Sequence, residues 1–160
     1  MLFRSARTAL LLILTLSLAC SDGSPTAPGT ALSFESIAQL SYSGFPVQQM
    51  SAVRGEREWH EVWRTLYAGQ SPVPALPSVD FARETVILAA AGSRSNGCYS
   101  IEITRASWTR SGAVAFEVLE TFPGSTCGCT QAVTQPVHVV RLAAVSAAET
   151  FVLRRAELAC

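Results

Sequence analysis

The chain has 160 residues with as many basic as acidic side chains, and every basic residue is an arginine. The absence of lysine excludes Schiff-base chemistry and a lysine general base. The arginines are not gathered into a basic stripe, so nucleic acid is not expected as a partner. About 130 residues remain after the N-terminal segment described next, which is enough for one domain with its own core.

The first 19 residues are predicted to be an export signal. Two arginines precede an apolar run that begins at Ala9, and small residues follow it, as in secretory signals. The run is too short to span a bilayer as a permanent helix, which takes about 20 apolar residues. LSLAC at 16–20 resembles a bacterial lipobox, in which the cysteine, here Cys20, is lipidated and becomes the mature N-terminus. Ser17 and Ala19 also fit the small-x-small rule of ordinary signal cleavage, which stays open as an alternative.

Residues 20–31 are predicted to be the lipidated cysteine and a flexible tether. The segment from Ser21 to Ala31 is rich in Ser, Gly, Pro and Thr and has no apolar pattern, as in linkers without fixed structure. A tether of this kind separates a domain from a lipid anchor in a membrane. We therefore expect a protein of the bacterial cell envelope that is lipid-anchored and faces the periplasm or the cell exterior.

The residues that follow the tether predict strands and then a helix. Between Ala31 and Phe45, apolar residues alternate with small polar ones, which indicates one or two strands that end at Gly44. The segment GEREWHEVWRTLYAG at 55–69 has acidic residues in the first turn of a helical pattern. Its apolar side chains lie on one face and are expected to pack on a sheet rather than to form a ligand site: Trp59, Val62, Trp63 and Leu66.

After a proline-rich loop at 69–80, the chain predicts about five strands. TVILAAAG is continuously apolar and suits a central strand. The next two strands alternate in polarity around the turn TRSG, which predicts a hairpin with Val114, Phe116 and Val118 facing inward. PVHVVRL and TFVLRRAEL supply the last two strands. We expect a single α+β domain over 32–160, a mainly antiparallel sheet or sandwich with one amphipathic helix packed on it.

Few residues carry groups suited to catalysis. His60 lies on the flank of the predicted helix and is expected at the surface. His138 faces away from its neighbours in a strand and is interpreted as a solvated side chain or a cross-strand partner. The chain contains no Gly-x-Ser-x-Gly, His-Glu-x-x-His or P-loop motif. We therefore expect binding rather than turnover, with no catalytic residue and no cofactor.

The loop GSRSNGCYS, from Gly92 to Ser100, is the best candidate for a binding site. It joins two predicted strands and carries Arg94 at its tip, and loops on a rigid scaffold often display binding residues. The simpler interpretation is an ordinary type I′ turn at Asn96-Gly97. That interpretation leaves the presence of Arg94 unexplained.

The cysteines beyond Cys20 predict two disulfides, because an even number in an exported chain favours pairing. They are Cys98, Cys127, Cys129 and Cys160. Zinc also accepts four thiolates, but the Cys-Gly-Cys spacing strains its usual geometry, and a redox role has no thioredoxin-like context. A bond between Cys127 and Cys129 would close a small, strained ring. The favoured scheme joins one of them to Cys98 and the other to Cys160.

Several short motifs occur in order between Val79 and Phe151. They are a VDF lead-in, an apolar strand ending in Gly, a Gly-x-Tyr-Ser-x-x-Ile strand, a Pro-Gly-x-x-Cys loop and a Thr-Gln-Pro strand. This order resembles the C-terminal domain of the protease complex subunit PrcB family. The family loop before the tyrosine is typically Pro-Thr-Gly-Gly, whereas residues 95–98 read SNGC here. The difference suggests that Cys98 forms a disulfide to the Pro-Gly-x-x-Cys loop.

The resemblance implies an exported or lipid-anchored accessory protein, named after a subunit that accompanies an exported serine protease. We therefore expect a non-catalytic lipoprotein that binds a protein partner, such as an exported protease, through the loops at 92–99 and 122–136. The expected contact residues are Arg94, Asn96, Tyr99 and Thr134. One alternative is a protease inhibitor whose loops plug an active site. The other is a small metal or redox protein that uses Cys127, Cys129 and His138.

Overall fold

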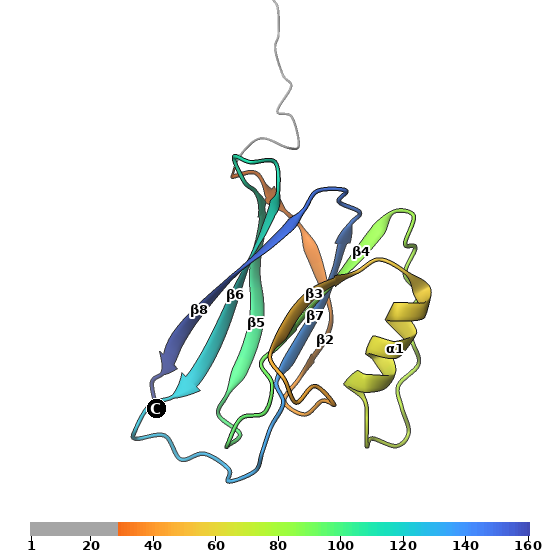
Figure 1. Ribbon diagram of the computed structural model, residues 1–160. Coiled ribbons are helices and arrows are strands. Elements are labelled where there is room, and N and C mark those ends of the chain that lie inside the picture. The colour runs from red at the N-terminus through yellow and green to blue at the C-terminus, as the bar shows by residue number, and fades with distance from the viewer. Residues whose placement is uncertain (1–28) are drawn as a thin grey trace, which may run out of the picture.

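Two four-stranded β-sheets pack face to face, and one helix covers the outer face of one of them (Figure 1). The computed structural model describes residues 29–160. The predicted signal peptide, Cys20 and most of the predicted tether lie outside the described residues. The fold class predicted for the domain is confirmed. Within the described part of the chain, no helix has the length and apolarity needed to cross a membrane.

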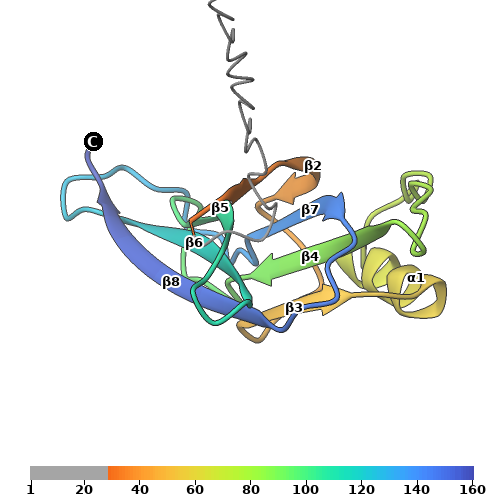
Figure 2. The ribbon, with the colours of Figure 1, turned by 90° about the horizontal axis from the view of Figure 1, so that it is seen from above.

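The helix and strands follow one another along the chain much as the sequence pattern indicates. They are β1 (Ala31–Leu32), β2 (Phe34–Leu40), β3 (Gln49–Val53), α1 (Glu56–Leu66), β4 (Glu84–Ala90), β5 (Ser100–Trp108), β6 (Val114–Pro123), β7 (Val137–Ala143) and β8 (Glu149–Leu158). The inner sheet has the order β2-β7-β4-β3 and lies between α1 and the outer sheet, whose order is β1-β5-β6-β8 (Figure 2). One residue separates β1 from β2, so the chain passes from one sheet to the other at Ser33.

The inner sheet is buried on both faces, which explains the continuous apolar run of β4. Side chains of a strand alternate between its two faces. Val86 and Leu88 accordingly pack towards α1, whereas Ile87 and Ala89 face the outer sheet. Because β4 lies between β7 and β3, the predicted central strand is confirmed.

The two tryptophans of α1 are core residues, as predicted. Trp59, Trp63 and Leu66 are buried against the inner sheet. The indole N–H groups of Trp59 and Trp63 donate hydrogen bonds of 3.0 Å to the carbonyls of Pro77 and Pro74. A buried indole N–H needs such an acceptor. The same two side chains therefore fill the core and hold the proline-rich loop against the helix.

The outer sheet contains the predicted hairpin of β5 and β6. Val114, Phe116 and Val118 of β6 point into the core between the sheets, as the alternation predicts. All neighbouring strands are antiparallel except β6 and β8, which run parallel. The chain leaves β6, adds β7 to the inner sheet and then returns to the outer sheet, which brings β8 back in the direction of β6.

Two features of the N-terminal half differ from the sequence interpretation. The segment at Gln49–Val53 forms β3 and pairs with β4, although no strand is predicted there. Ala31, expected as the last residue of the tether, pairs with Ser107 in β1. Both strands are short and lie at a sheet edge, so their own sequence carries little alternation and pairing with a neighbour decides their structure.

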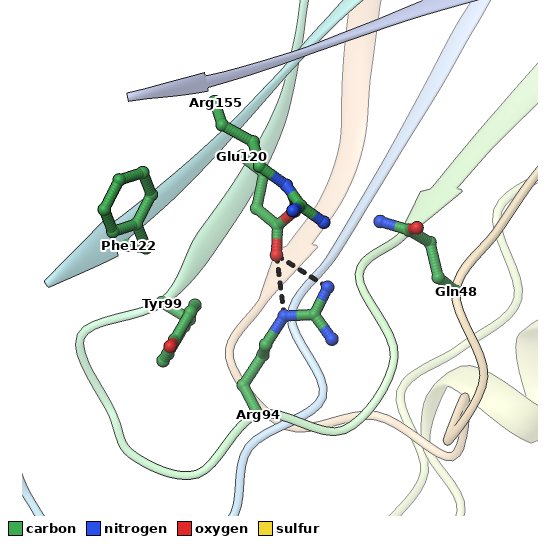
Figure 3. Close-up of a pocket in the computed structure, with 6 residues that line it drawn as sticks. All are labelled: Gln48, Arg94, Tyr99, Glu120, Phe122 and Arg155. Atoms are coloured by element: carbon green, nitrogen blue, oxygen red, sulfur yellow. Dashed lines mark hydrogen bonds and ion pairs between the residues drawn. The ribbon is translucent and has the colours of Figure 1, made fainter. Parts of the chain in front are cut away.

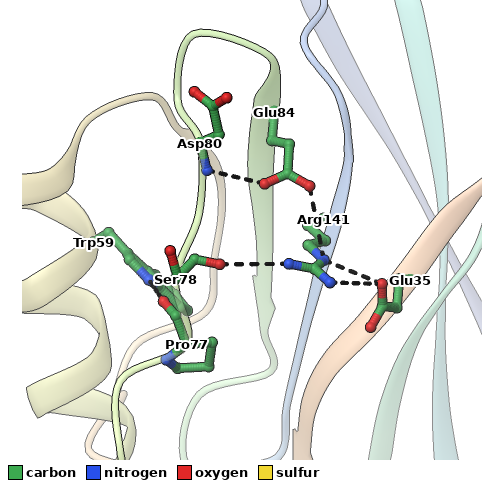
Figure 4. Close-up of polar contacts among 7 residues, drawn as sticks. All are labelled: Glu35, Trp59, Pro77, Ser78, Asp80, Glu84 and Arg141. Carbon is green, nitrogen blue, oxygen red and sulfur yellow. Dashed lines mark hydrogen bonds and ion pairs between the residues drawn. The ribbon is translucent and has the colours of Figure 1, made fainter.

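Arg141 of β7 contacts three neighbouring segments of the chain (Figure 4). Its Nη2 and Nε donate to Oε2 of Glu35 at 2.9 and 3.1 Å, its Nη1 donates to the carbonyl of Ser78, and Glu84 lies beside it. The hydrogen bond to Glu35 and the negative charge of that carboxylate raise the pKa of Arg141, so the guanidinium stays charged. The contacts join β2, β4 and the loop before β4.

Candidate functional site

A pocket of about 520 Å³ opens at the end of the sandwich where β6 and β8 finish. We call it the Glu120 pocket. β6 supplies Glu120 and Phe122, and β8 supplies Arg155, while loops contribute the remaining side chains (Figure 3). Its lining residues are Gln48, Arg94, Tyr99, Glu120, Phe122 and Arg155. Four separate stretches of the chain therefore meet at this point.

Glu120 is buried because it continues the inward alternation of β6. Only 2 % of the residue is exposed, and an unpaired buried carboxylate would be strongly unfavourable. Nε and Nη2 of Arg94 both lie 2.6 Å from its Oε1, and Nε of Arg155 lies 2.9 Å from its Oε2. Two guanidinium groups thus flank one carboxylate, and the cluster carries one net positive charge.

The loop that carries Arg94 is fixed mainly by its backbone. Gly92 has a φ of +79° and lies so close to residues 46–48 that a Cβ would sit 2.7 Å from the nitrogen of Gln48. Arg94 and Thr134 exchange backbone hydrogen bonds of 2.8 and 2.9 Å as an isolated bridge. The hydroxyl of Thr134 also donates to the carbonyl of Asn96 at 2.9 Å. The Arg94 side chain is thereby directed at Glu120 from a fixed backbone.

The four predicted contact residues divide into two groups. Arg94 and Tyr99 line the Glu120 pocket, with the Arg94 guanidinium 5.8 Å from the centre of the Tyr99 ring. Thr134 is fully buried, so its side chain positions the loop and does not reach a partner. The side-chain oxygen of Asn96 accepts a hydrogen bond from the backbone N–H of Cys98.

The prediction of a type I′ turn at Asn96-Gly97 is wrong. Such a turn needs positive φ at both central residues, and neither residue has it. The Asn96 side chain closes a local turn onto Cys98, and the backbone N–H of Gly97 donates to the carbonyl of Thr130. The residues at 96–98 therefore pack the loop at 92–99 against the loop that contains Thr130, and they do not form a tight hairpin.

Two disulfides join the segments that surround the pocket. Cys98 is bonded to Cys129, and Cys127 is bonded to Cys160, which agrees with the favoured pairing. The first bond ties the loop at 92–99 to the loop at 124–136. The second ties the latter loop to the end of the chain beyond β8. Disulfides persist in oxidising compartments, so they suit an exported protein.

The residues proposed for a metal or redox site are not brought together. Within 29–160, no group of three His, Cys, Asp or Glu side chains is placed to hold a metal ion. His138 is buried between the sheets, not solvated, because both faces of the inner sheet are covered. Its Nδ1 accepts a hydrogen bond from the backbone N–H of Ile103, so the neutral ring carries its proton on Nε2 and donates to the Ser36 hydroxyl. His60 is exposed, as predicted.

The buried ring of His138 predicts a loss of stability in mild acid. Burial lowers the pKa of His138, and the nearby charge of Glu102 only partly opposes this. As the pH falls below about 6.5, His138 therefore takes up a proton in the unfolded chain before it does so in the folded protein. The free energy of unfolding then drops by up to about 1.4 kcal/mol per pH unit, until the pH reaches the lowered pKa of His138 in the folded protein. Urea unfolding from about pH 7.5 to about pH 5 measures this slope.

The matched variants for that measurement are His138→Gln and His60→Gln. His138→Gln is expected to lower stability at neutral pH by about 1–3 kcal/mol, because it disturbs two buried hydrogen bonds, and to flatten the pH dependence. His60→Gln removes an exposed imidazole and is expected to keep the slope of the original protein. Equal slopes in the two variants would contradict the assignment of the acid effect to His138.

The described residues thus form a β-sandwich with two disulfides and a charged pocket at one end. Residues 85–143 match the family model described as PrcB C-terminal. The resemblance inferred from the motifs is therefore confirmed over residues 85–143. The match runs from β4 to β7 and contains Arg94, Tyr99 and Glu120, whereas Gln48 and Arg155 lie outside it. Neither a search of curated proteins nor a search of solved structures found a match.

Four pocket residues are not among the predicted contact residues, although Phe122 begins the loop at 122–136 that is predicted to bind: Gln48, Glu120, Phe122 and Arg155. A signal for Glu120 exists, because it follows Val114, Phe116 and Val118 at the same two-residue spacing. A glutamate on the buried face of a strand requires a cationic partner. No comparable signal marks Gln48 or Arg155, since each reaches the pocket only through the tertiary arrangement of the sheets.

Proposed function

We propose that this chain is a non-catalytic exported lipoprotein whose domain serves as an accessory or stabilising subunit for an envelope protein, such as an exported protease. The observation that carries the proposal is the construction of the Glu120 pocket. Its guanidinium groups and aromatic rings are held by strand ends and disulfide-linked loops, so a partner meets a site that is already formed. Preorganisation of this kind reduces the entropic cost of binding.

The pocket's chemistry supports binding rather than turnover. Glu120 is the carboxylate in the pocket, and both of its oxygens are occupied by guanidinium groups. A general base must accept a proton from its substrate, and a carboxylate whose two oxygens both accept from guanidinium groups is not free to reach one. The other lining groups are amide, phenol, phenyl and guanidinium, which suit contacts with a polypeptide.

The family match and the disulfides support the setting of this proposal. The match of residues 85–143 to the PrcB C-terminal family model supports association with a protease complex. The disulfides suit an oxidising compartment outside the cytoplasm. The pattern of an apolar run, Cys20 and a polar tether supports lipid anchoring to the envelope.

Photo-cross-linking from Tyr99 tests the proposed function. The full chain, expressed in its own host, carries a photoreactive phenylalanine analogue in place of Tyr99, and the matched control carries it in place of exposed His60 on α1. We expect one defined envelope protein to be cross-linked from position 99 and not from position 60. The same products from both positions, or none from position 99, would contradict the proposal. Stoichiometric inhibition of a cross-linked protease would instead support the inhibitor alternative.

A further inference from the structure

The two arginines of the Glu120 pocket differ in how their hydrogen-bond donors are used. Arg94 directs Nε and Nη2 to Glu120 and Nη1 to the carbonyl of Ser93, and its side chain is only 19 % exposed. Arg155 directs Nε alone to Glu120, and its side chain is 60 % exposed. Among residues 29–160, no acceptor engages its terminal Nη groups. Arg94 therefore anchors the cluster, and Arg155 presents its outer edge to the cavity.

From this asymmetry, we propose that the Glu120 pocket binds a peptide carboxylate, supplied by an acidic side chain or by the C-terminus of the partner. The inference rests on the proposed function, because it names the chemistry by which the partner is held. A carboxylate matches the two parallel N–H donors along the outer edge of a guanidinium. Glu120 fixes the orientation of that edge through Nε, and the cluster's net positive charge favours an anion.

The rest of the lining favours a peptide over a small free anion. The amide of Gln48 faces the cluster from the other side of the cavity and supplies another hydrogen-bonding group (Figure 3). The rings of Tyr99 and Phe122 form apolar walls beside the charges. The volume of about 520 Å³ is in the range of sites for ligands much larger than one anion. An apolar side chain adjacent to the carboxylate would contact these rings.

Titration with short peptides, followed by the amide NMR signals of the full chain, tests this inference. The probes are acetyl-Ser-Phe-Glu-Gly-amide with its Gln counterpart, and acetyl-Gly-Ser-Phe as free acid and as amide. We expect an acid form to bind at least about tenfold more tightly than its neutral counterpart, with shifts at Tyr99 and Phe122. The first pair reports an acidic side chain and the second a C-terminus as the source of the carboxylate.

Arg155→Met is the decisive variant, and Arg154→Met is its matched control. Both arginines lie on β8 and are mostly exposed, but Arg154 points to the opposite face and pairs with Glu117. Arg155→Met is expected to abolish the preference for the acid form, while Arg154→Met keeps it. A dispersed spectrum confirms that each variant is folded.

Other results would contradict the proposed carboxylate site. Equal binding of acid and neutral peptides, or no shifts at millimolar peptide, would overturn the inference. Acetate or inorganic phosphate binding as tightly as the peptides would show a site for small anions only. Cross-linking from position 99 that persists in Arg155→Met would leave the proposed function standing while this inference fails.

Discussion

Replacing Glu120 with alanine is expected to lower the free energy of unfolding by about 3–5 kcal/mol, the range found when one partner of a buried ion pair is removed. The variant leaves the Arg94 guanidinium, which is mostly buried, without its carboxylate. It also removes the link between the loop at 92–99 and the ends of β6 and β8. Urea unfolding with both disulfides intact measures the loss.

Glu117→Ala is the matched control for this prediction. Glu117 lies on the same strand, but it faces outward, is 33 % exposed at its side chain and pairs with Arg154 at 3.7 Å. Exposed ion pairs of this kind contribute about 1 kcal/mol or less. If the two alanine variants lost similar stability, the burial of Glu120 would not be the source of the effect.

The elements that follow from local pattern were the ones predictable from sequence. The α1 stripe repeats every three to four residues, and the alternation of β5 and β6 repeats every two, so each reports the face that is buried. The burial of Trp63 and Phe116 confirms both patterns. The same two-residue alternation, continued from Val118, would also have predicted that Glu120 faces the core.

The parts that escaped prediction depend on contacts distant in sequence. β3 becomes a strand by pairing with β4, and the direction of β8 follows from the passage of the chain through the inner sheet. The solvated alternative for His138 is wrong because the outer sheet covers the ring, and nothing in β7 shows this. The cross-strand alternative is confirmed by its hydrogen bond with Ser36 of the neighbouring β2. A sequence pattern reflects the surroundings of one element at a time, whereas these features depend on pairs of elements.

The candidate site shows the same division. Arg94 and Tyr99 were found because they lie on a polar, glycine-bounded loop between two strands. Arg155 comes from the last strand and Gln48 from the segment before β3, so their convergence is set by the sandwich. The disulfide pairing was predictable in part, because chemistry excluded a bond within Cys-Gly-Cys. Which of Cys127 and Cys129 joins Cys98 stayed open, and the structure shows that it is Cys129.

Removing the Cys98–Cys129 disulfide with the double variant Cys98→Ser/Cys129→Ser is expected to lower the free energy of unfolding by roughly 3–4 kcal/mol. The bond closes a loop across a sequence separation of 31. Without it the unfolded chain gains conformational entropy, and this entropy lowers the free energy of the unfolded state by about 3–4 kcal/mol. The variant also releases the loop that carries Arg94 and Tyr99, so cross-linking from position 99 is expected to fall as well.

Cys127→Ser/Cys160→Ser separates these two effects. Its disulfide spans a nearly equal separation of 33, so the loss of stability should be similar. The ladder between β6 and β8 continues to Leu158 and still holds Arg155 in place, and the loop at 92–99 keeps its own bond. We therefore expect this variant to retain cross-linking from position 99 under conditions in which both variants are folded. Equal loss of cross-linking in the two variants would mean that binding depends on general stability, and the fixed position of the loop at 92–99 would no longer explain it.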